Sequence, residues 1–390
     1  MTPFLKSFTI LLIAVSSVSP AFAQGKRTLL TDAQRKEAQE IITQFRKVRG
    51  KQEQRLAAIE RMDAIGPMGL KQLLEIIQKE LGKQVSDYRQ AFVKAAAAEG
   101  IKNLNEGNLA EIAKLRAEVL ALSKQPELKK EDIVRVGDPG LARLKELIIF
   151  GRKEVLEKHP ELAKRRDAFE PLGKQWEKCA ELMLVAQAKE EEKIRKEKEQ
   201  AEKDREKAAA DAKAKVKEEG EPKEDDQPLE PPSFEKYLVK EEEMAAAMAM
   251  PMDDETRLTL AANAQVAGKL DPEEVRCILD LNLTRSLLGL KAVQTDAPLT
   301  LAARDHSGDM EALHFFAHES PVPGKKTPGD RAQRFGASYS GENIAMGTVD
   351  GTTANQMWWH SPGHHKNMLG SHSKVGVGKS GVYWTELFGN

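Results

Sequence analysis

The pattern of apolar and polar positions divides the chain into a long helical part and a shorter part of mixed character. From Thr31 to about Leu184, apolar residues recur every three or four positions, which predicts amphipathic helices. Thr31 and Gln34 have the spacing of a capping box that begins the first helix. We expect a bundle or an array of helical hairpins. Two similar segments, 65–73 and 136–144, leave a degenerate helical repeat as the alternative.

The stretch 189–219 consists almost entirely of charged residues, alanine and glutamine. Ile194 and Val216 are its only large aliphatic residues, so it lacks the regular apolar positions that a coiled-coil seam needs. Lysines and glutamates three or four positions apart can hold a solvated helix, and disorder is the competing interpretation. Residues 220–233 contain four prolines and several acids, which is typical of a linker.

The last third of the chain has the pattern of an α+β domain. One helix begins at Pro272 after an acidic cap, another begins near Asp296, and a short one covers 329–336. Two strands, 375–378 and 382–388, are joined by a turn that contains glycine. A constant spacing of four places several side chains on or near one face of the second helix: His306, Met310, His314 and His318.

The N-terminus has the pattern of a secretory signal. Lys6 supplies a positive charge, an apolar run covers 8–18, and Ala21-Phe22-Ala23 is a small-x-small cleavage site. We expect cleavage after Ala23 and a mature chain that is secreted, periplasmic or at the cell surface; an uncleaved anchor is the alternative. No later segment approaches the ~20 apolar residues of a membrane span, so no transmembrane segment is expected in the mature chain.

These patterns predict the domain organisation. It comprises a signal peptide at 1–23, a helical domain at 24–188, a charged helix or disordered linker at 189–233, a helical approach segment at 234–270 and a compact α+β domain at 271–390.

The overall charge excludes some classes of partner, and the distribution of histidines and tryptophans indicates which part of the chain contains a functional site. Lys and Arg number 60 against 61 Asp and Glu, so no overall field selects nucleic acid or an anionic membrane. Seven of the eight histidines lie at or after His306, and three of the four tryptophans at or after Trp358, so a site is expected in the last 85 residues or so. The only cysteines, Cys179 and Cys277, are predicted as two buried free thiols, with a disulfide as the alternative.

The segment Gly341-Glu342-Asn343-Ile344-Ala345 is the central candidate for chemistry. Glu342 is expected either at the edge of a pocket or as a hydrogen-bonding hub that ties a loop. His314 and His318 have a spacing that can bind a metal from one helix. They lack the adjacent glutamate of a metalloprotease helix, because Phe315 follows His314.

Seven motifs occur in order in the last part of the chain, and together they resemble the CAP superfamily, the SCP-like extracellular domain, in its cysteine-poor bacterial branch. The resemblance covers about residues 275–390, and no resemblance is found for the N-terminal region. The motifs are Leu281-Asn282 with Arg285 and Gly289-Leu290; Ala303 with His306-Ser307 and Asp309-Met310; Phe315-Phe316-Ala317-His318 with Ser320-Pro321; Gly341-Glu342-Asn343-Ile344-Ala345; Trp358 with Ser361-Pro362-Gly363-His364 and Asn367-Met368-Leu369; Val375-Gly376-Val377-Gly378; and Trp384-Thr385-Glu386-Leu387-Phe388-Gly389.

The resemblance implies an α-β-α sandwich around a central antiparallel sheet, in a protein that is secreted or faces the surface. In eukaryotic relatives a cleft with two histidines and two glutamates can hold a divalent ion such as zinc. His318 matches the first histidine and Glu342 the first glutamate, whereas Ser361 and Tyr383 occupy the other two positions. His364 could complete a set of His318, Glu342 and His364 with an open position for zinc. The alternative is a polar network in which His318 and Glu342 hydrogen-bond to each other.

Two functions follow from this interpretation. The first is a binding or interaction module for an extracellular or periplasmic ligand or protein, and the second is a divalent-metal-dependent hydrolase that uses His318, Glu342 and His364. A serine hydrolase based on Ser361 lacks a nucleophile elbow, and no catalytic residue is assigned. The residues expected to line the cleft are His318, Glu342, Asn343, Ser361, His364 and Tyr383.

Overall fold

A computed structural model describes residues 30–99, 106–148, 152–210, 231–250 and 252–390. The predicted signal peptide and most of the predicted linker lie outside these residues. None of the described helices combines the length and the apolar content needed to cross a membrane.

The N-terminal part consists of helices, as the apolar spacing predicts. The capping box of Thr31 and Gln34 is present at the start of α1, which confirms the predicted helix start. Gly66 has a φ of 102° before α3, whereas Gly137 lies inside continuous helix, so the two similar segments do not share one turn. The helices are α1 (Asp32–Lys47), α2 (Gln52–Asp63), α3 (Pro67–Glu99), α4 (Glu106–Ser123), α5 (Lys130–Asp132), a π-helical turn (Ile133–Gly137), α6 (Asp138–Ile148), α7 (Arg152–Lys158) and α8 (Pro160–Ala210).

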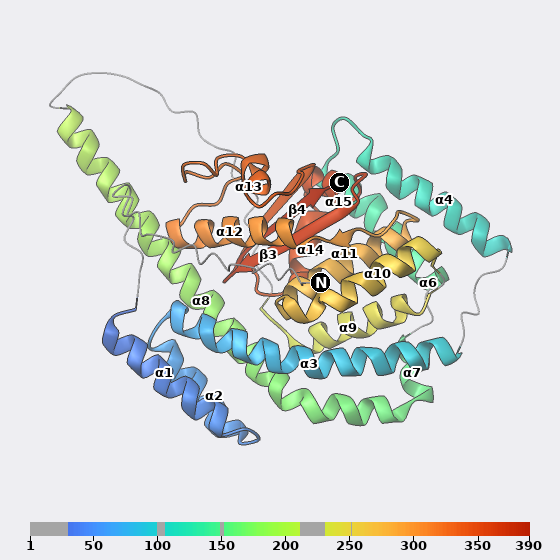
Figure 1. The fold of residues 1–390 in the computed structure, drawn as a ribbon, viewed down its shortest axis with the longest axis horizontal. Coiled ribbons are helices and arrows are strands. Elements are labelled where there is room, and N and C mark those ends of the chain that lie inside the picture. The colour runs from blue at the N-terminus through green and yellow to red at the C-terminus, as the bar shows by residue number, and fades with distance from the viewer. Residues whose placement is uncertain (1–29, 100–105, 149–151, 211–230, 251) are drawn as a thin grey trace, which may run out of the picture.

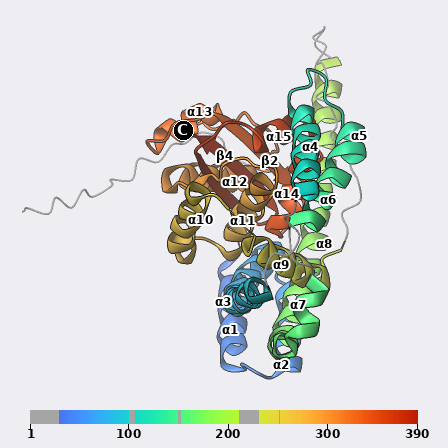
Figure 2. The same ribbon diagram turned by 90° about the vertical axis from the view of Figure 1, so that its right-hand side faces the viewer.

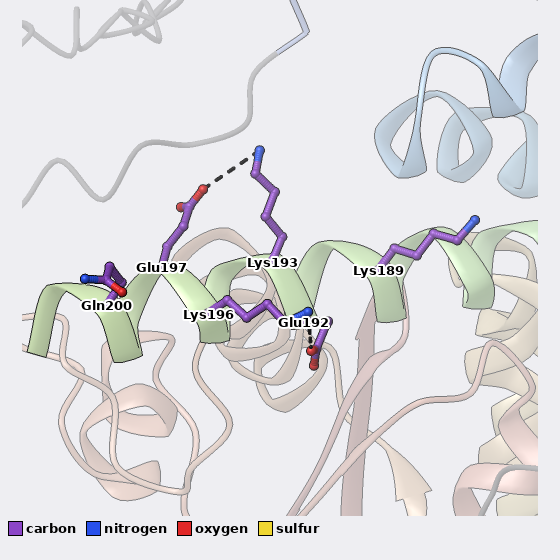
Figure 3. Close-up of a pocket in the computed structure, with 6 residues that line it drawn as sticks. All are labelled: Lys189, Glu192, Lys193, Lys196, Glu197 and Gln200. Atoms are coloured by element: carbon purple, nitrogen blue, oxygen red, sulfur yellow. Dashed lines mark ion pairs between the residues drawn. The ribbon is translucent and has the colours of Figure 1, made fainter. Parts of the chain in front are cut away.

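Helix α8 carries the charged stretch as far as Ala210. Residues 189–210 are helical, which agrees with the solvated-helix interpretation for this part; residues 211–219 are not described. Ion pairs one turn apart run along the helix, as between Lys196 and Glu192 at 3.1 Å (Figure 3). Each such exposed pair stabilises a helix by only about 0.3–0.5 kcal/mol, so the helix depends on several of them.

The C-terminal part confirms the predicted α+β class. Its elements are α9 (Phe234–Met248), α10 (Asp254–Val266), a 3-10 turn (Ala267–Lys269), α11 (Pro272–Leu287), β1 (Gln294–Thr295), α12 (Ala297–Leu313), α13 (Pro328–Arg334), β2 (Gly341–Met346), α14 (Gly351–Trp359), α15 (Pro362–Met368), β3 (Lys374–Ser380) and β4 (Tyr383–Gly389).

Four strands form one sheet in the order β1-β3-β4-β2. The strands β3, β4 and β2 pair antiparallel, as the resemblance implies, and the two-residue strand β1 pairs with β3 in parallel at the edge of the sheet. The sequence pattern missed β2, whose first five residues are all buried. A strand that is buried on both faces shows no apolar–polar alternation, so periodicity does not reveal it.

Helices cover both faces of the sheet, as Figure 1 shows. Helix α12 packs on β3 and β4, where a Cβ added at Gly376 would lie 2.2 Å from the backbone of Leu299. Glycine is therefore required for this close approach. Helices α11, α14 and α15 cover the other face around Trp384 and Phe388. The result is an α-β-α sandwich.

The N-terminal helices share their hydrophobic cores with this sandwich. One core contains Ile41 and Phe92 together with Ile344 and Tyr383, and a second contains residues of α4 and α6 together with Trp358 and Trp384. Figure 2 shows the helices α1 to α3 at the end of the molecule opposite to α13. The predicted boundary near residue 233 stays a prediction. Cys179 and Cys277 lie in different cores and are buried free thiols.

A buried ionic cluster joins α3, α9 and α11. Arg276 of α11 is 1% exposed and donates to Glu241 of α9 at 2.6 Å and to Asp350, the N-cap of α14. Arg89 of α3 donates to the same Glu241 at 2.7 Å. Separating these helices would leave buried charges without compensation, which is energetically costly. The cluster therefore fixes the helices relative to one another.

Candidate functional site

His318 lies in a loop and not on the helix that carries His306. Helix α12 ends at Leu313 because His314 adopts the left-handed conformation, with φ of 53° and ψ of 53°, and its N–H donates to the carbonyl of Met310. The predicted helical face through His318 was therefore wrong. His306 remains on α12, and its Nε2 lies 3.1 Å from the carbonyl oxygen of Ala317, so it supports the residue before His318.

His318, Glu342 and Arg331 form a hydrogen-bonded chain. Nδ1 of His318 donates to Oε1 of Glu342 at 2.9 Å, and Nη2 of Arg331 donates to Oε2 of the same carboxylate at 2.6 Å. The side chains of Glu342 and Arg331 are 1% and 0% exposed, whereas that of His318 is 49% exposed. The histidine is thus the solvent-facing end of a buried ion pair.

Arg331 also fixes the loop that carries His318. Its guanidinium donates to the carbonyl of His318 at 3.0 Å and to the carbonyls of Lys325 and Lys326 at 3.0 and 3.2 Å. A capping box of Thr327 and Asp330 begins α13 and thereby positions Arg331. Both the charge and the geometry at Glu342 therefore depend on α13.

His364 lies beside His318, with their ring centroids 5.8 Å apart. Burial, assisted by the neighbouring His318, lowers the pKa of His364 to about 4. Its imidazole is therefore neutral at physiological pH. Ser361 is the half-buried N-cap of α15, but its side chain makes no capping hydrogen bond.

Asn343 points away from Glu342, because successive residues of a strand face opposite sides. Its Nδ2 donates to Oε2 of Glu386 at 2.7 Å, and Nδ2 of Asn367 donates to its Oδ1 at 2.9 Å. Asn367 also donates to the carbonyl of Glu342 at 2.9 Å. Burial raises the pKa of Glu386 to about 8. Asn343 therefore supports the strand from the opposite face and does not lie on the side of His318.

Tyr383 lies at the far end of the sheet from His318. It pairs with Met346, whereas Glu342 pairs with Leu387, and four residues of a strand span roughly 13 Å. Its hydroxyl donates to Oε1 of Glu191 on α8 at 3.0 Å. Of the six residues predicted for the cleft, the structure brings together His318, Glu342 and His364, with Ser361 nearby in the chain.

The residues at Glu342 do not fit a divalent ion. Both oxygens of its carboxylate already accept hydrogen bonds, and the permanent positive charge of Arg331 lies next to them. Among the described residues, no three His, Cys, Asp or Glu side chains are arranged to hold a metal. The metal set of His318, Glu342 and His364 is therefore not formed here.

Arg331 is the functional residue that the sequence analysis missed. A carboxylate buried at the start of β2 requires a partner charge, and Arg331 and Arg334 are the nearest cations before it in the chain. The shallow depression lined by Lys189, Glu192 and neighbouring residues belongs to α8 alone and lies along one flank of that helix (Figure 3).

Comparison with known proteins shows which family the C-terminal part is similar to. The model of the CAP family, the cysteine-rich secretory protein family, matches residues 280–384. The chain is 35% identical over 148 residues to the uncharacterized protein YkwD of Bacillus subtilis (strain 168), which covers 37% of this chain and 55% of that protein. It is 36% identical over 124 residues to the uncharacterized membrane protein YlbC of the same organism, which covers 31% of this chain and 35% of that protein.

A solved structure of an extracellular protein containing a SCP domain, from Bacillus anthracis str. Ames, is 34% identical to this chain. The match covers 30% of this chain and 40% of that chain, with a TM-score of 0.29. The class is given by the CAP family model, which matches residues 280–384, in agreement with the resemblance of the seven motifs. The chain spans 55% and 35% of the length of the two curated relatives, and the family model leaves its N-terminal region uncovered.

Proposed function

We propose that the chain is exported and that its CAP domain is a binding module that meets its ligand through His318. The observation that carries this proposal is the contrast in exposure within one hydrogen-bonded chain: His318 is half exposed, while Glu342 and Arg331 beneath it are buried. A side chain held in one orientation by a buried ion pair loses little entropy when a ligand binds.

The geometry supports hydrolysis less well. An imidazole whose Nδ1 donates to a carboxylate resembles the base of a catalytic triad. In the described part of the chain, however, no serine, threonine or cysteine hydrogen-bonds to Nε2 of His318. The carboxylate is also paired with Arg331, which does not fit the metal-dependent alternative. Binding is therefore the function that these residues support best.

Cosedimentation of the full chain with a bacterial envelope preparation tests the proposal. Envelopes isolated from Bacillus subtilis are a suitable probe, because the two curated relatives come from that organism. His318→Ala should weaken binding by about tenfold, the size expected of a contact at the centre of a site. His159→Ala is the matched control, because Nδ1 of His159 forms a pair with Oε1 of Glu161 at 3.2 Å in the helical part.

Equal binding of the wild-type chain and His318→Ala, with both proteins folded by circular dichroism, would contradict the proposed role of His318. Export is tested separately by mass spectrometry of the chain recovered from the cell exterior. The expected N-terminal residue of that chain is Gln24.

A further inference from the structure

We infer that the ligand held at His318 is a neutral saccharide that offers hydroxyl groups, an inference that rests on the binding function proposed above. Three properties of the site carry it: its charge, the hydrogen-bonding state of the imidazole, and an exposed aromatic ring at the start of the helix that carries Arg331.

The charges beneath the site cancel. Glu342 is paired with Arg331, and neither side chain reaches solvent. An anionic ligand cannot contact the guanidinium, because Arg331 is fully buried and donates to three backbone carbonyls as well as to Glu342. A cationic ligand finds a carboxylate that is already neutralised. The site therefore selects for neither sign of charge.

Nε2 of His318 has no hydrogen-bond partner among the described residues, and its character is set by the contact of Nδ1. A carboxylate only accepts hydrogen bonds, so the hydrogen at the contact with Glu342 is on Nδ1. In the neutral ring, Nε2 is then an acceptor. A ligand hydroxyl can donate to this nitrogen without any change in the buried pair.

Tyr339 supplies an exposed aromatic ring at the start of α13, the helix that carries Arg331. It is 44% exposed and is the only aromatic residue among the exposed large apolar side chains of the described residues. Its ring packs on α13, where a Cβ added at Gly329 would lie 3.8 Å from Cδ1, two positions before Arg331. Burial and the charge of Glu342 raise the pKa of Tyr339, which agrees with its place beside the same carboxylate.

A flat ring and an acceptor together fit a sugar better than a lipid or a peptide side chain. The C–H face of a pyranose packs on an aromatic ring, while its hydroxyls stay available for hydrogen bonds. A lipid chain needs a continuous apolar surface. The other exposed apolar side chains instead lie singly on different elements: Leu109 on α4, Val134 on the π-helical turn, Val185 on α8, Leu258 on α10 and Leu301 on α12.

Isothermal titration of the full chain tests the inference with two soluble probes, a tetrasaccharide of N-acetylglucosamine and maltotetraose. At least one should bind, and Tyr339→Ala and His318→Ala should each weaken that binding by about tenfold. Tyr339→Phe keeps the ring and should bind within about twofold of wild type, as should Leu301→Ala, an exposed apolar control on α12. EDTA should leave the affinity unchanged, because Arg331 already compensates the carboxylate.

Absence of binding to both saccharides overturns the inference, and so does saccharide binding that is unchanged in Tyr339→Ala. Tyr339-dependent binding to phosphatidylglycerol vesicles would identify a lipid ligand and would also overturn it. Cosedimentation with envelopes that depends on His318, without saccharide binding, leaves the proposed function standing and removes only the saccharide. Loss of both the His318-dependent cosedimentation and the saccharide binding would contradict both the proposed function and the saccharide ligand.

Discussion

Asn343 and Glu386 face each other across strands β2 and β4, with the amide nitrogen 2.7 Å from the carboxylate oxygen Oε2. The other oxygen of Glu386 is buried without a hydrogen-bond partner among the described residues. Burial is the largest influence on this acid and raises its pKa to about 8, against the smaller opposing effects of Asn343 and Arg285. The centre of the sandwich therefore contains a carboxyl group that keeps its proton at neutral pH.

Glu386→Gln should make the chain less sensitive to alkaline pH. The folded state holds a proton that the unfolded state releases between pH about 4.5 and about 8, so the free energy of unfolding of wild type falls across this interval. Relative to wild type, the variant should gain roughly 3–5 kcal/mol between pH 5 and pH 8. Urea unfolding at both pH values measures this. Glu319→Gln, at an exposed glutamate, is the control, and a constant difference between wild type and Glu386→Gln would refute the prediction.

His364→Gln should change the acid side of the stability profile in the opposite sense. Burial lowers the pKa of His364 to about 4. As pH falls, the unfolded state therefore binds a proton near pH 6.5, whereas the folded state binds it only near pH 4. Wild type therefore loses stability as pH falls through this interval, by about 3 kcal/mol from this residue. The variant should lose less, as measured by thermal melts at pH 7 and pH 4.5. Parallel losses in both proteins would show that His364 does not cause the effect.

Arg331→Met should be strongly destabilising because it leaves the charge of Glu342 buried without compensation. We expect the free energy of unfolding to fall by about 3–5 kcal/mol. Adding Glu342→Gln removes the buried charge, so the double variant should be more stable than the sum of the single effects predicts. Urea denaturation of the four proteins measures the coupling.

A surface pair provides the control for this cycle. Lys326 and Glu319 lie 3.6 Å apart with side chains 69% and 68% exposed, and exposed pairs couple by at most about 1 kcal/mol. A coupling between Arg331 and Glu342 as small as that of the surface pair would show that the buried pair does not compensate the charge of Glu342.

Tyr383→Phe tests the contact between helix α8 and the sheet. The hydroxyl donates to Glu191 at 3.0 Å, and the tyrosine is 2% exposed. Losing one hydrogen bond to a charged acceptor should cost about 1.5–3 kcal/mol, while binding at His318 should be unchanged because the two residues lie at opposite ends of the sheet. Melting temperature and envelope cosedimentation measure these two effects. A loss of binding with little loss of stability would place Tyr383 in the binding site after all.

The two cysteines should be inert in the folded chain. Burial raises the pKa of both thiols, so neither forms a reactive thiolate at neutral pH. A thiol reagent such as Ellman's should titrate no thiol in the native protein and two in urea. A native chain that still shows no thiol after unfolding would instead contain the Cys179–Cys277 disulfide.

Local signals in the sequence were sufficient for part of the fold. The cap at Thr31, the proline at Pro272 and the last two strands follow from interactions within a few residues. The end of α12 does not, because His314 closes the helix without the glycine that commonly marks a left-handed cap. The regular spacing of residues alone therefore predicted, wrongly, that the helix continues to His318. Strand β2 was missed for the related reason that burial on both faces removes alternation.

The sequence allowed a prediction of the candidate site only for residues that belong to a recognisable motif. His318 and Glu342 were paired through a resemblance, and the structure places them 2.9 Å apart. Arg331 was not found, because the burial of Glu342, which requires a partner charge, is not visible in the sequence, and neither is the choice between Arg331 and Arg334. Tyr383 was assigned to the cleft by its position in a motif, but the register of β4 places it next to Met346.

The core that contains both Ile41 and Tyr383 joins opposite ends of the chain. Such contacts raise the contact order, which predicts slow folding. On the ribosome, α3 and α8 emerge before the β3–β4 hairpin, whose Val382 and Tyr383 share their core, so their apolar surface toward it stays uncovered until the hairpin is made. A chain released before this hairpin is made is therefore expected to aggregate or to be degraded.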